Sequence, residues 1–238
     1  MSVGIGKRCA AEATGVFILV LIGPGAAVVD RLVGRGFLGP VGIALAFFFA
    51  LLAGISAFAP LSGAHFNPAV TAGFWSIGSF PTRDIAPYVV AQCAGAVAAA
   101  LLLRGLMGDA AIAAATVPSI SIARAFAVEF VFSAILMIVI LRVSNDSRVS
   151  ESLAAVSVAA CVGGLALLGA LTGSSMNPAR SLGPAVATGE WRAHWIYWGA
   201  PIAGMVLTSL ASHWLRRDDP RTLRHDATPL GVEGPLPS

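Results

Sequence analysis

Two stretches of the sequence, LSGAHFNPAVTAGFWSIGS at residues 61–79 and TGSSMNPARSLGPAVATGE at residues 172–190, carry the tripeptide Asn-Pro-Ala near their middle. Gly, Pro, Ser and Asn interrupt both stretches too often for either to cross a bilayer alone. A proline in the first turn is pre-organised to begin a helix. The pattern therefore predicts two re-entrant loops, each an extended segment followed by a short helix. Because non-helical backbone is tolerated at membrane depth only beside a wet cavity or inside protein, two such loops indicate a pore or substrate cavity.

The composition around these loops is that of a membrane protein. Of 238 residues, 57% are hydrophobic and only 11% are charged, against about 25% charged in a soluble domain. The mean hydropathy is +0.82. Long apolar runs, without the period-two alternation of a membrane barrel, favour helices of about 20 residues. The spans predicted are residues 9–29, 39–59, 85–103, 120–141, 152–171 and 195–215.

Other classes of protein fit this composition poorly. A net charge of +3 is interpreted as basic loops rather than a nucleic-acid surface. Cys9, Cys93 and Cys161 fall in apolar segments and are interpreted as buried small residues, not as a disulfide set. The first span could be a cleaved signal peptide, but its length and Glu12 argue against this.

The two halves of the chain repeat each other. Asn67-Pro68-Ala69 recurs as Asn177-Pro178-Ala179 after 110 residues, and Glu12 recurs as Glu129 after 117. Three spans per repeat is an odd number, so the second copy enters the membrane from the opposite side. The predicted fold is an all-α membrane protein with six transmembrane helices and two re-entrant half-helices in an inverted repeat, about 8–106 and 120–215. Such a repeat places the working site at the repeat interface, near the bilayer midplane.

The loop charges predict the orientation, since Lys and Arg accumulate on the cytoplasmic side. With both termini on one side, that side holds nine basic residues: Lys7, Arg8, Arg83, Arg142, Arg148, Arg216, Arg217, Arg221 and Arg224. The other side holds five: Arg31, Arg35, Arg104, Arg124 and Arg192. We therefore expect a multi-pass protein of the cell membrane with cytoplasmic termini. Residues 1–216 form the predicted channel domain, and 217–238, rich in Pro and charge, a disordered tail.

The repeated asparagines have a physical use. Asn67 and Asn177 would cap two half-helices whose positive ends meet near the membrane centre, so that their amides donate to a neutral solute while the field repels cations. Backbone carbonyls on the approach would act as acceptors; the residues expected to supply them are Gly63, Ala64, His65, Ser175 and Met176. Arg180 directly follows the second Asn-Pro-Ala tripeptide. A charge at membrane depth costs about 2.5–3.5 kcal/mol and is a functional candidate by default.

The stretches SGAHFNPAVT (62–71) and TGSSMNPARS (172–181) resemble the paired signature loops of the major intrinsic proteins, the aquaporin and aquaglyceroporin family. The likeness extends over about residues 8–215, with Ala11-Glu12, Gly15, Tyr88, Gln92, Glu129 and YWGAPIAG (197–204). It implies a passive channel for water and small neutral solutes in a homotetramer within membrane lipid. It implies no enzymatic activity, cofactor, metal or nucleic-acid partner.

The resemblance also implies a selectivity filter. Besides Arg180, counting from the asparagines assigns Phe47, Leu165 and Ser174 to it. Water-selective members usually have histidine at the position of Leu165. Here Phe47 and Leu165 would form two apolar walls that face the polar Arg180 and Ser174, and such an opening suits glycerol, urea or undissociated arsenite. Other positions resemble water channels: Ser181, Ala185, Tyr197 and Trp198. Both a solute-passing channel and a strictly water-selective one remain open.

Two buried carboxylates need a role, because acidic residues in lipid are rare. Glu12 and Glu129 could form a proton relay, but the resemblance favours support of the re-entrant loops. His65 has no second ligand at metal spacing, and no hydrolytic constellation accompanies the serines. A secondary transporter is the remaining alternative, since inverted repeats and broken helices occur there too.

Overall fold

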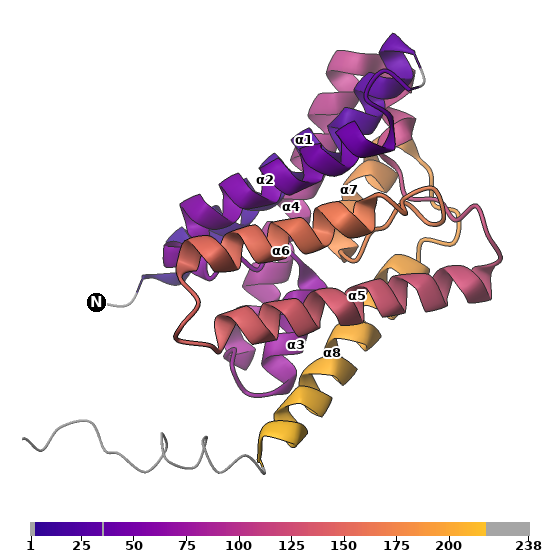
Figure 1. Cartoon of the computed structure of the whole chain (residues 1–238). Helices are drawn as coiled ribbons and strands as arrows, with labels where there is room; N and C mark the ends of the chain where they lie inside the picture. Colours follow the sequence, from indigo (N-terminus) through magenta and orange to yellow (C-terminus); the bar gives the residue numbers. More distant parts are fainter. Residues whose placement is uncertain (1–2, 35, 218–238) are drawn as a thin grey trace, which may run out of the picture.

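A computed structural model describes residues 3–34 and 36–217, so the predicted tail lies outside the described residues except for Arg217. This part of the chain contains helices and no strand. The elements in chain order are α1 (Ile5–Val33), α2 (Gly39–Ser62), α3 (Pro68–Ser76), α4 (Thr82–Met107), η1 (Gly108–Ala114), α5 (Ile122–Ser144), α6 (Glu151–Ala166), α7 (Pro178–Thr188) and α8 (Ile196–Arg217) (Figure 1).

All six predicted spans are helices, but they differ in length and apolarity. Four described helices, α1, α2, α4 with η1, and α5, are long and apolar enough to cross a membrane. Helix α8 has 22 residues but is less apolar. Helix α6 has 16 residues and ends at Ala166, five residues before the predicted end. The carbonyl of Leu171 instead accepts from the backbone N–H of Ser119, 3.0 Å away, so this stretch bonds to a neighbouring segment rather than continuing the helix.

The helices confirm the predicted inverted repeat. Helices α1 to α4 form one half and α5 to α8 the other; α1 packs on α4 as α5 packs on α8. The short helices cross over, because α3 packs against α8 and α7 against α4. The interior of the protein is therefore built from both halves together.

Close helix approach depends on two repeat-related glycines. A Cβ on Gly95 would lie 2.1 Å from the carbonyl oxygen of Ala13, and one on Gly204 would lie 2.5 Å from that of Phe130. Small residues allow helix backbones to come this close in membranes, where van der Waals packing rather than hydrophobic burial holds helices together.

Asparagine and proline begin both half-helices locally. The Asn67 side-chain oxygen accepts from Ala69 N at 2.8 Å, and that of Asn177 accepts from Ala179 N at 3.0 Å. Each asparagine is thus an N-cap, which satisfies a donor that the helix leaves unpaired. Pro68 and Pro178 occupy the first helical position, where the missing N–H costs nothing.

Candidate functional site

The two half-helices meet tip to tip through their asparagines. The Asn67 side-chain nitrogen donates to the carbonyl of Met176 at 2.8 Å, and that of Asn177 donates to the carbonyl of Phe66, also at 2.8 Å. Each bond joins one repeat to the other. Each side-chain amide nitrogen carries two hydrogens, so after this bond every asparagine retains one further N–H.

The carbonyls that receive these bonds belong to residues in an uncommon backbone conformation. Phe66 has φ 50° and Met176 has φ 53°, and two residues earlier Ala64 and Ser174 have φ 49° and 43°. Such left-handed conformations cost non-glycine residues about 1–3 kcal/mol each and persist only where surrounding structure holds them. The same pattern in both repeats shows that the loop shape is imposed by its neighbours.

Glu12 supplies that constraint in the first repeat. Its carboxylate accepts from the backbone N–H groups of His65 at 2.9 Å and Phe66 at 2.6 Å, and from side chains of Ser62 and Gln92 at 2.7 and 2.8 Å. The carboxylate is fully buried. These four donors offset the cost of burying it and turn the Phe66 carbonyl toward Asn177.

Glu129 has the equivalent position in the second repeat. It accepts from the N–H groups of Ser175 at 2.9 Å and Met176 at 2.8 Å, and from the Thr172 hydroxyl at 2.6 Å. Every one of these donors belongs to the loop that precedes Asn177. Both carboxylates are thus hydrogen-bonded to backbone N–H groups of the re-entrant loops.

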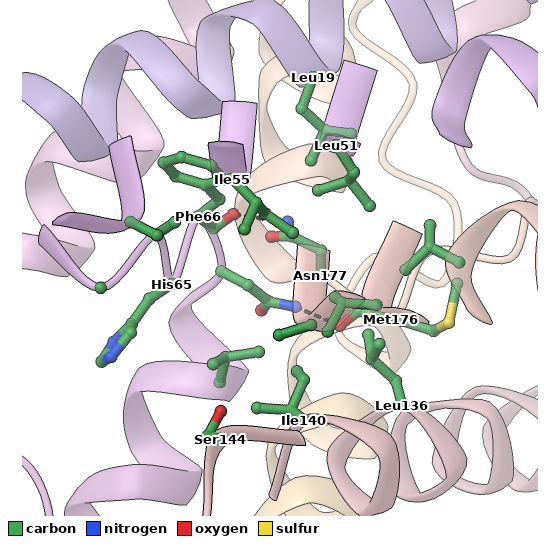
Figure 2. A pocket seen from close by; sticks show the side chains of 18 of the residues that line it. Leu19, Leu51, Ile55, His65, Phe66, Leu136, Ile140, Ser144, Met176 and Asn177 are labelled. Atoms are coloured by element: carbon green, nitrogen blue, oxygen red, sulfur yellow. Dashed lines mark hydrogen bonds between the residues drawn. The ribbon is translucent and has the colours of Figure 1, made fainter. Parts of the chain in front are cut away.

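One cavity of about 190 Å³ passes along the meeting point of the loops. Its wall includes the polar residues Ser144 and Glu151, both asparagines, and Arg180 with Phe47. Apolar side chains form much of the remaining wall, including Leu19, Leu51, Ile55, Leu136 and Ile140 (Figure 2). Since one water takes about 30 Å³ of liquid, the space suits a short file of small molecules. A few polar groups in an apolar wall set orientation without binding tightly.

Among the described residues that line this cavity, Arg180 is the only arginine or lysine. It is 6% exposed, and its Nη1 donates to the carbonyl of Ala114 at 2.9 Å. Its guanidinium carbon lies 5.4 Å from the centre of the Phe47 ring, a cation–π distance. The buried Nε has no partner among the described residues. A guanidinium with an unused donor at a cavity wall can bind a passing oxygen atom and repel cations.

The connection between α5 and α6 adds an acidic group, Asp146, to a shallow pocket that Glu151 also lines. A hydrogen bond from the Arg148 side chain, followed by one from the Arg148 backbone N–H, lowers the pKa of Asp146 to about 2. Asp146 therefore stays ionised at neutral pH, although it is paired with Arg148 rather than free to attract a cation.

Comparison with known proteins identifies this arrangement. The sequence profile of the family described as "Major intrinsic protein" matches residues 1–212. The chain is 37% identical to Aquaporin AqpM of Methanothermobacter marburgensis over 242 residues, covering 90% of this chain and 98% of the relative. It is 38% identical to Aquaporin NIP1-2 of Oryza sativa subsp. japonica over 217 residues, covering 88% and 71%. The aquaglyceroporin structure from Plasmodium falciparum superposes with a TM-score of 0.79 at 26% identity, covering 88% of this chain and 96% of that one.

The chain belongs to the major intrinsic protein family. It is therefore a membrane channel and not an enzyme, which confirms the expectation from the paired Asn-Pro-Ala loops. Its relatives and its structural neighbour support conduction of water and small solutes.

Most of the residues that the sequence of this major intrinsic protein assigns to the permeation site line the cavity. Of the set expected to line it, the structure places the following there: Phe47, Gly63, Ala64, His65, Asn67, Ser174, Ser175, Met176, Asn177 and Arg180. Leu165 is different, because its side chain packs against the core and is not among the residues that line this cavity. The Ser174 hydroxyl donates to the Leu165 carbonyl at 3.0 Å, so this hydroxyl is already engaged by backbone rather than free for solute.

Several contributors were missed from the sequence. Ala114 supplies a carbonyl to Arg180, and Phe66, left out of the predicted carbonyls, supplies one to Asn177. Tyr88 donates to the carbonyl of Ser62 at 2.9 Å, as Tyr197 does to that of Thr172 at 2.7 Å. The repeat offset could have found the tyrosine pair, because both tyrosines are separated by 109 residues like other matched positions.

Proposed function

We propose that this channel passes water together with small neutral solutes, such as glycerol, urea or undissociated arsenite, and excludes protons and ions. The observation that carries the proposal is one cavity among the described residues whose wall contains Asn67, Asn177 and Arg180 together. Each polar group faces a wall that is otherwise largely apolar. A neutral molecule can exchange hydrogen bonds with these groups, whereas a cation meets one full charge and two positive helix ends.

Exclusion of protons follows from the same groups. A chain of waters conducts protons by hopping only if each water can donate onward to the next. At the middle of the cavity Asn67 and Asn177 each retain an N–H donor, so we propose that a central water accepts from both and cannot relay a proton.

We further propose that Phe47, Ser174 and Arg180 form the filter together with Leu165, whose side chain lies outside the cavity wall but whose carbonyl accepts from the Ser174 hydroxyl, and that Glu12 and Glu129 support the loops. The functional unit proposed is a homotetramer in the cell membrane with cytoplasmic termini, each subunit folding residues 1–216 into one channel. The many apolar side chains exposed on the long helices, such as Phe49, Val90 and Leu106, fit contact with lipid and with other subunits.

A strictly water-selective channel is the second candidate, and one contact favours it. The Phe47 ring stacks 5.4 Å from the guanidinium carbon of Arg180, and a bulky aromatic at this point narrows the passage. A secondary transporter is disfavoured because the two half-helices are joined tip to tip across the repeats, which opposes alternating movement of one repeat against the other.

The test is osmotic shrinkage of proteoliposomes with water, glycerol, urea and arsenite measured in parallel. We expect a low activation energy and a rate that rises linearly with the solute gradient, with no need for an ion gradient. Passage of water alone would select the water-selective alternative. Saturating flux that requires an ion gradient would contradict a channel altogether.

The Leu165→His variant tests the filter assignment. Leu165 packs behind the cavity wall, with its carbonyl bonded to the Ser174 hydroxyl. A histidine that turns from this position into the opening narrows it and adds a second polar wall, so we expect glycerol and urea flux to fall on the order of tenfold more than water flux, a discrimination of the size that one pocket contact provides. Equal loss for all three permeants, measured in the same liposome assay, would show that Leu165 does not determine selectivity.

The Ser174→Cys variant tests whether position 174 faces the passage. None of the described cysteines, Cys9, Cys93 and Cys161, lines the cavity, so mercury should inhibit the wild type weakly. A thiol at 174 binds mercury beside Arg180 and should reduce water flux about tenfold, with recovery in a thiol reductant. Strong mercury block of the wild type that substitution of Ser174 abolishes would contradict the expected weak inhibition, and mercury-insensitive water flux in a correctly inserted Ser174→Cys channel would contradict the placement.

A further inference from the structure

A chain of hydroxyl groups lies behind the second re-entrant loop. Thr116 Oγ1 donates to Ser181 Oγ at 2.8 Å, Ser181 Oγ lies 2.5 Å from Ser175 Oγ, and Ser175 Oγ donates to the carbonyl of Asn177 at 2.9 Å. Because the Ser175 hydrogen is used on Asn177, Ser181 must donate to Ser175, which sets one direction for the whole chain. Thr116, Ser175 and Ser181 are 4%, 5% and 1% exposed. Ser175 also lines the cavity, but Thr116 and Ser181 do not, so water in the cavity does not compete for the bond between Thr116 and Ser181.

The first repeat contains a related arrangement that ends on a different element. At the 110-residue offset His65 replaces Ser175 and Thr71 replaces Ser181, and His65 Nδ1 lies 3.1 Å from Thr71 Oγ1. There the third member is Gln92 on α4, whose Nε2 contacts Thr71 at 3.1 Å. Gln92 also donates to Glu12, so the first loop is tied to a long helix.

In the second repeat, the equivalent helix offers no side-chain donor to the re-entrant loop. Position 201, which matches Gln92 at the 109-residue offset, is Pro201 and offers no side-chain donor. Thr116 takes the place of that donor, but it lies between η1 and α5 rather than on a helix of its own repeat. The second loop is therefore tied to the connection between the two halves of the protein.

That connection also holds Arg180. Ala114, whose carbonyl accepts from Arg180, is two residues before Thr116. The approach is close, since a Cβ on Gly173 would lie 2.9 Å from Thr116 Cγ2. A shift of Thr116 would thus be transmitted both to the loop that ends at Asn177 and to the carbonyl that holds the guanidinium.

We propose that Thr116 is a positioning residue for selectivity: its hydrogen bond to Ser181 keeps the Ala114 carbonyl, and through it the Arg180 guanidinium, at a constant position in the cavity wall. This inference rests on the proposed function in so far as Arg180 discriminates between permeants. The connection between the repeats thereby contributes to the filter, although its alanine-rich sequence contains no motif that indicates such a role.

The experiment replaces Thr116 by valine, which has nearly the same shape but no hydroxyl. One buried hydrogen bond corresponds to a factor of about 2–10 in an equilibrium, so we expect the ratio of urea to water permeability to change about threefold or more. Thr116→Ser restores the hydroxyl and should restore the ratio. Thr14→Val is the matched control, because Thr14 is exposed on α1 and bonds only to the Ala10 carbonyl of its own helix.

Ser181→Ala removes the acceptor of the same hydrogen bond, and it tests the proposal if the Thr116→Val protein does not insert into the membrane. Both variants break the bond between Thr116 and Ser181, and Ser181→Ala also removes the bond to Ser175, so the double variant should change the ratio no more than Ser181→Ala alone. Additive changes, or an unchanged ratio in correctly inserted Thr116→Val or Ser181→Ala, would overturn the proposal. If the wild type passes no solute, the proposed solute range is wrong. The role of Thr116 is then tested by a different comparison: Thr116→Val, unlike Thr14→Val, should admit urea or alter the water flux.

Discussion

Replacement of Glu129 by leucine is expected to abolish most of the water flux. The substitution leaves the N–H groups of Ser175 and Met176 without acceptors inside the membrane, and each unpaired buried donor costs about 1–3 kcal/mol. Met176 would then lose the restraint that keeps its backbone at φ 53°, and its carbonyl would leave Asn67. We expect per-channel water permeability to fall about tenfold or more, and the thermal unfolding midpoint of the purified protein to drop.

Two further substitutions serve as comparisons for Glu129→Leu. Glu129→Gln retains one carbonyl oxygen as an acceptor and should give an intermediate loss. Glu190→Gln, on the connection between α7 and α8 and outside the cavity wall, should leave both flux and midpoint unchanged. Wild-type permeability in a correctly inserted Glu129→Leu channel would show that the loop holds its shape without the carboxylate.

Replacement of Arg180 by valine is expected to open the channel to cations and to larger solutes. A unit charge about 5 Å from a passing ion contributes roughly 3 kcal/mol at an effective dielectric constant of 20, so its removal should raise cation conductance on the order of 100-fold. The space vacated by the guanidinium also leaves the Phe47 ring facing an apolar wall. We expect glycerol flux to rise while water flux changes by less than about threefold.

The measurement uses vesicles with a potassium gradient and an internal pH dye, so that cation and proton leak are recorded separately. A leak of potassium alone would mean that the central asparagines exclude protons without Arg180. Arg192→Gln removes an arginine that is exposed between α7 and α8, and it should behave as wild type. Ion exclusion that survives in Arg180→Val would contradict the proposed role of the guanidinium.

The half-helices could be predicted because their determinants are close in sequence. Asn67 caps a helix two residues away and Pro68 begins it, and the same local chemistry recurs at Asn177. The repeat of these signals after an odd number of spans also predicted the inverted topology. Likewise, a carboxylate in an apolar run requires donors inside the protein, which made Glu12 and Glu129 candidates before any contact was known.

Other features depend on which residues the packing brings together. Ala114 is one of many alanines in its segment, and nothing local marks its carbonyl as the partner of Arg180, 66 residues away. Leu165 counts as a filter residue by its distance from Asn177, yet the end of α6 at Ala166 and the turn that follows place its side chain against the core. The exchange of Phe66 and Met176 carbonyls between opposite asparagines joins residues 109 and 111 positions apart.

The amino-acid sequence alone therefore determined the membrane class, the repeat and the two asparagine-capped half-helices, since these follow from apolar length and from hydrogen bonds between residues a few positions apart. The tertiary structure decided how the loops are braced, which carbonyl holds Arg180 and which side chains line the cavity. Those contacts form only when both halves of the chain pack together, because a buried polar group bonds to whatever donor or acceptor the fold places within 3 Å of it.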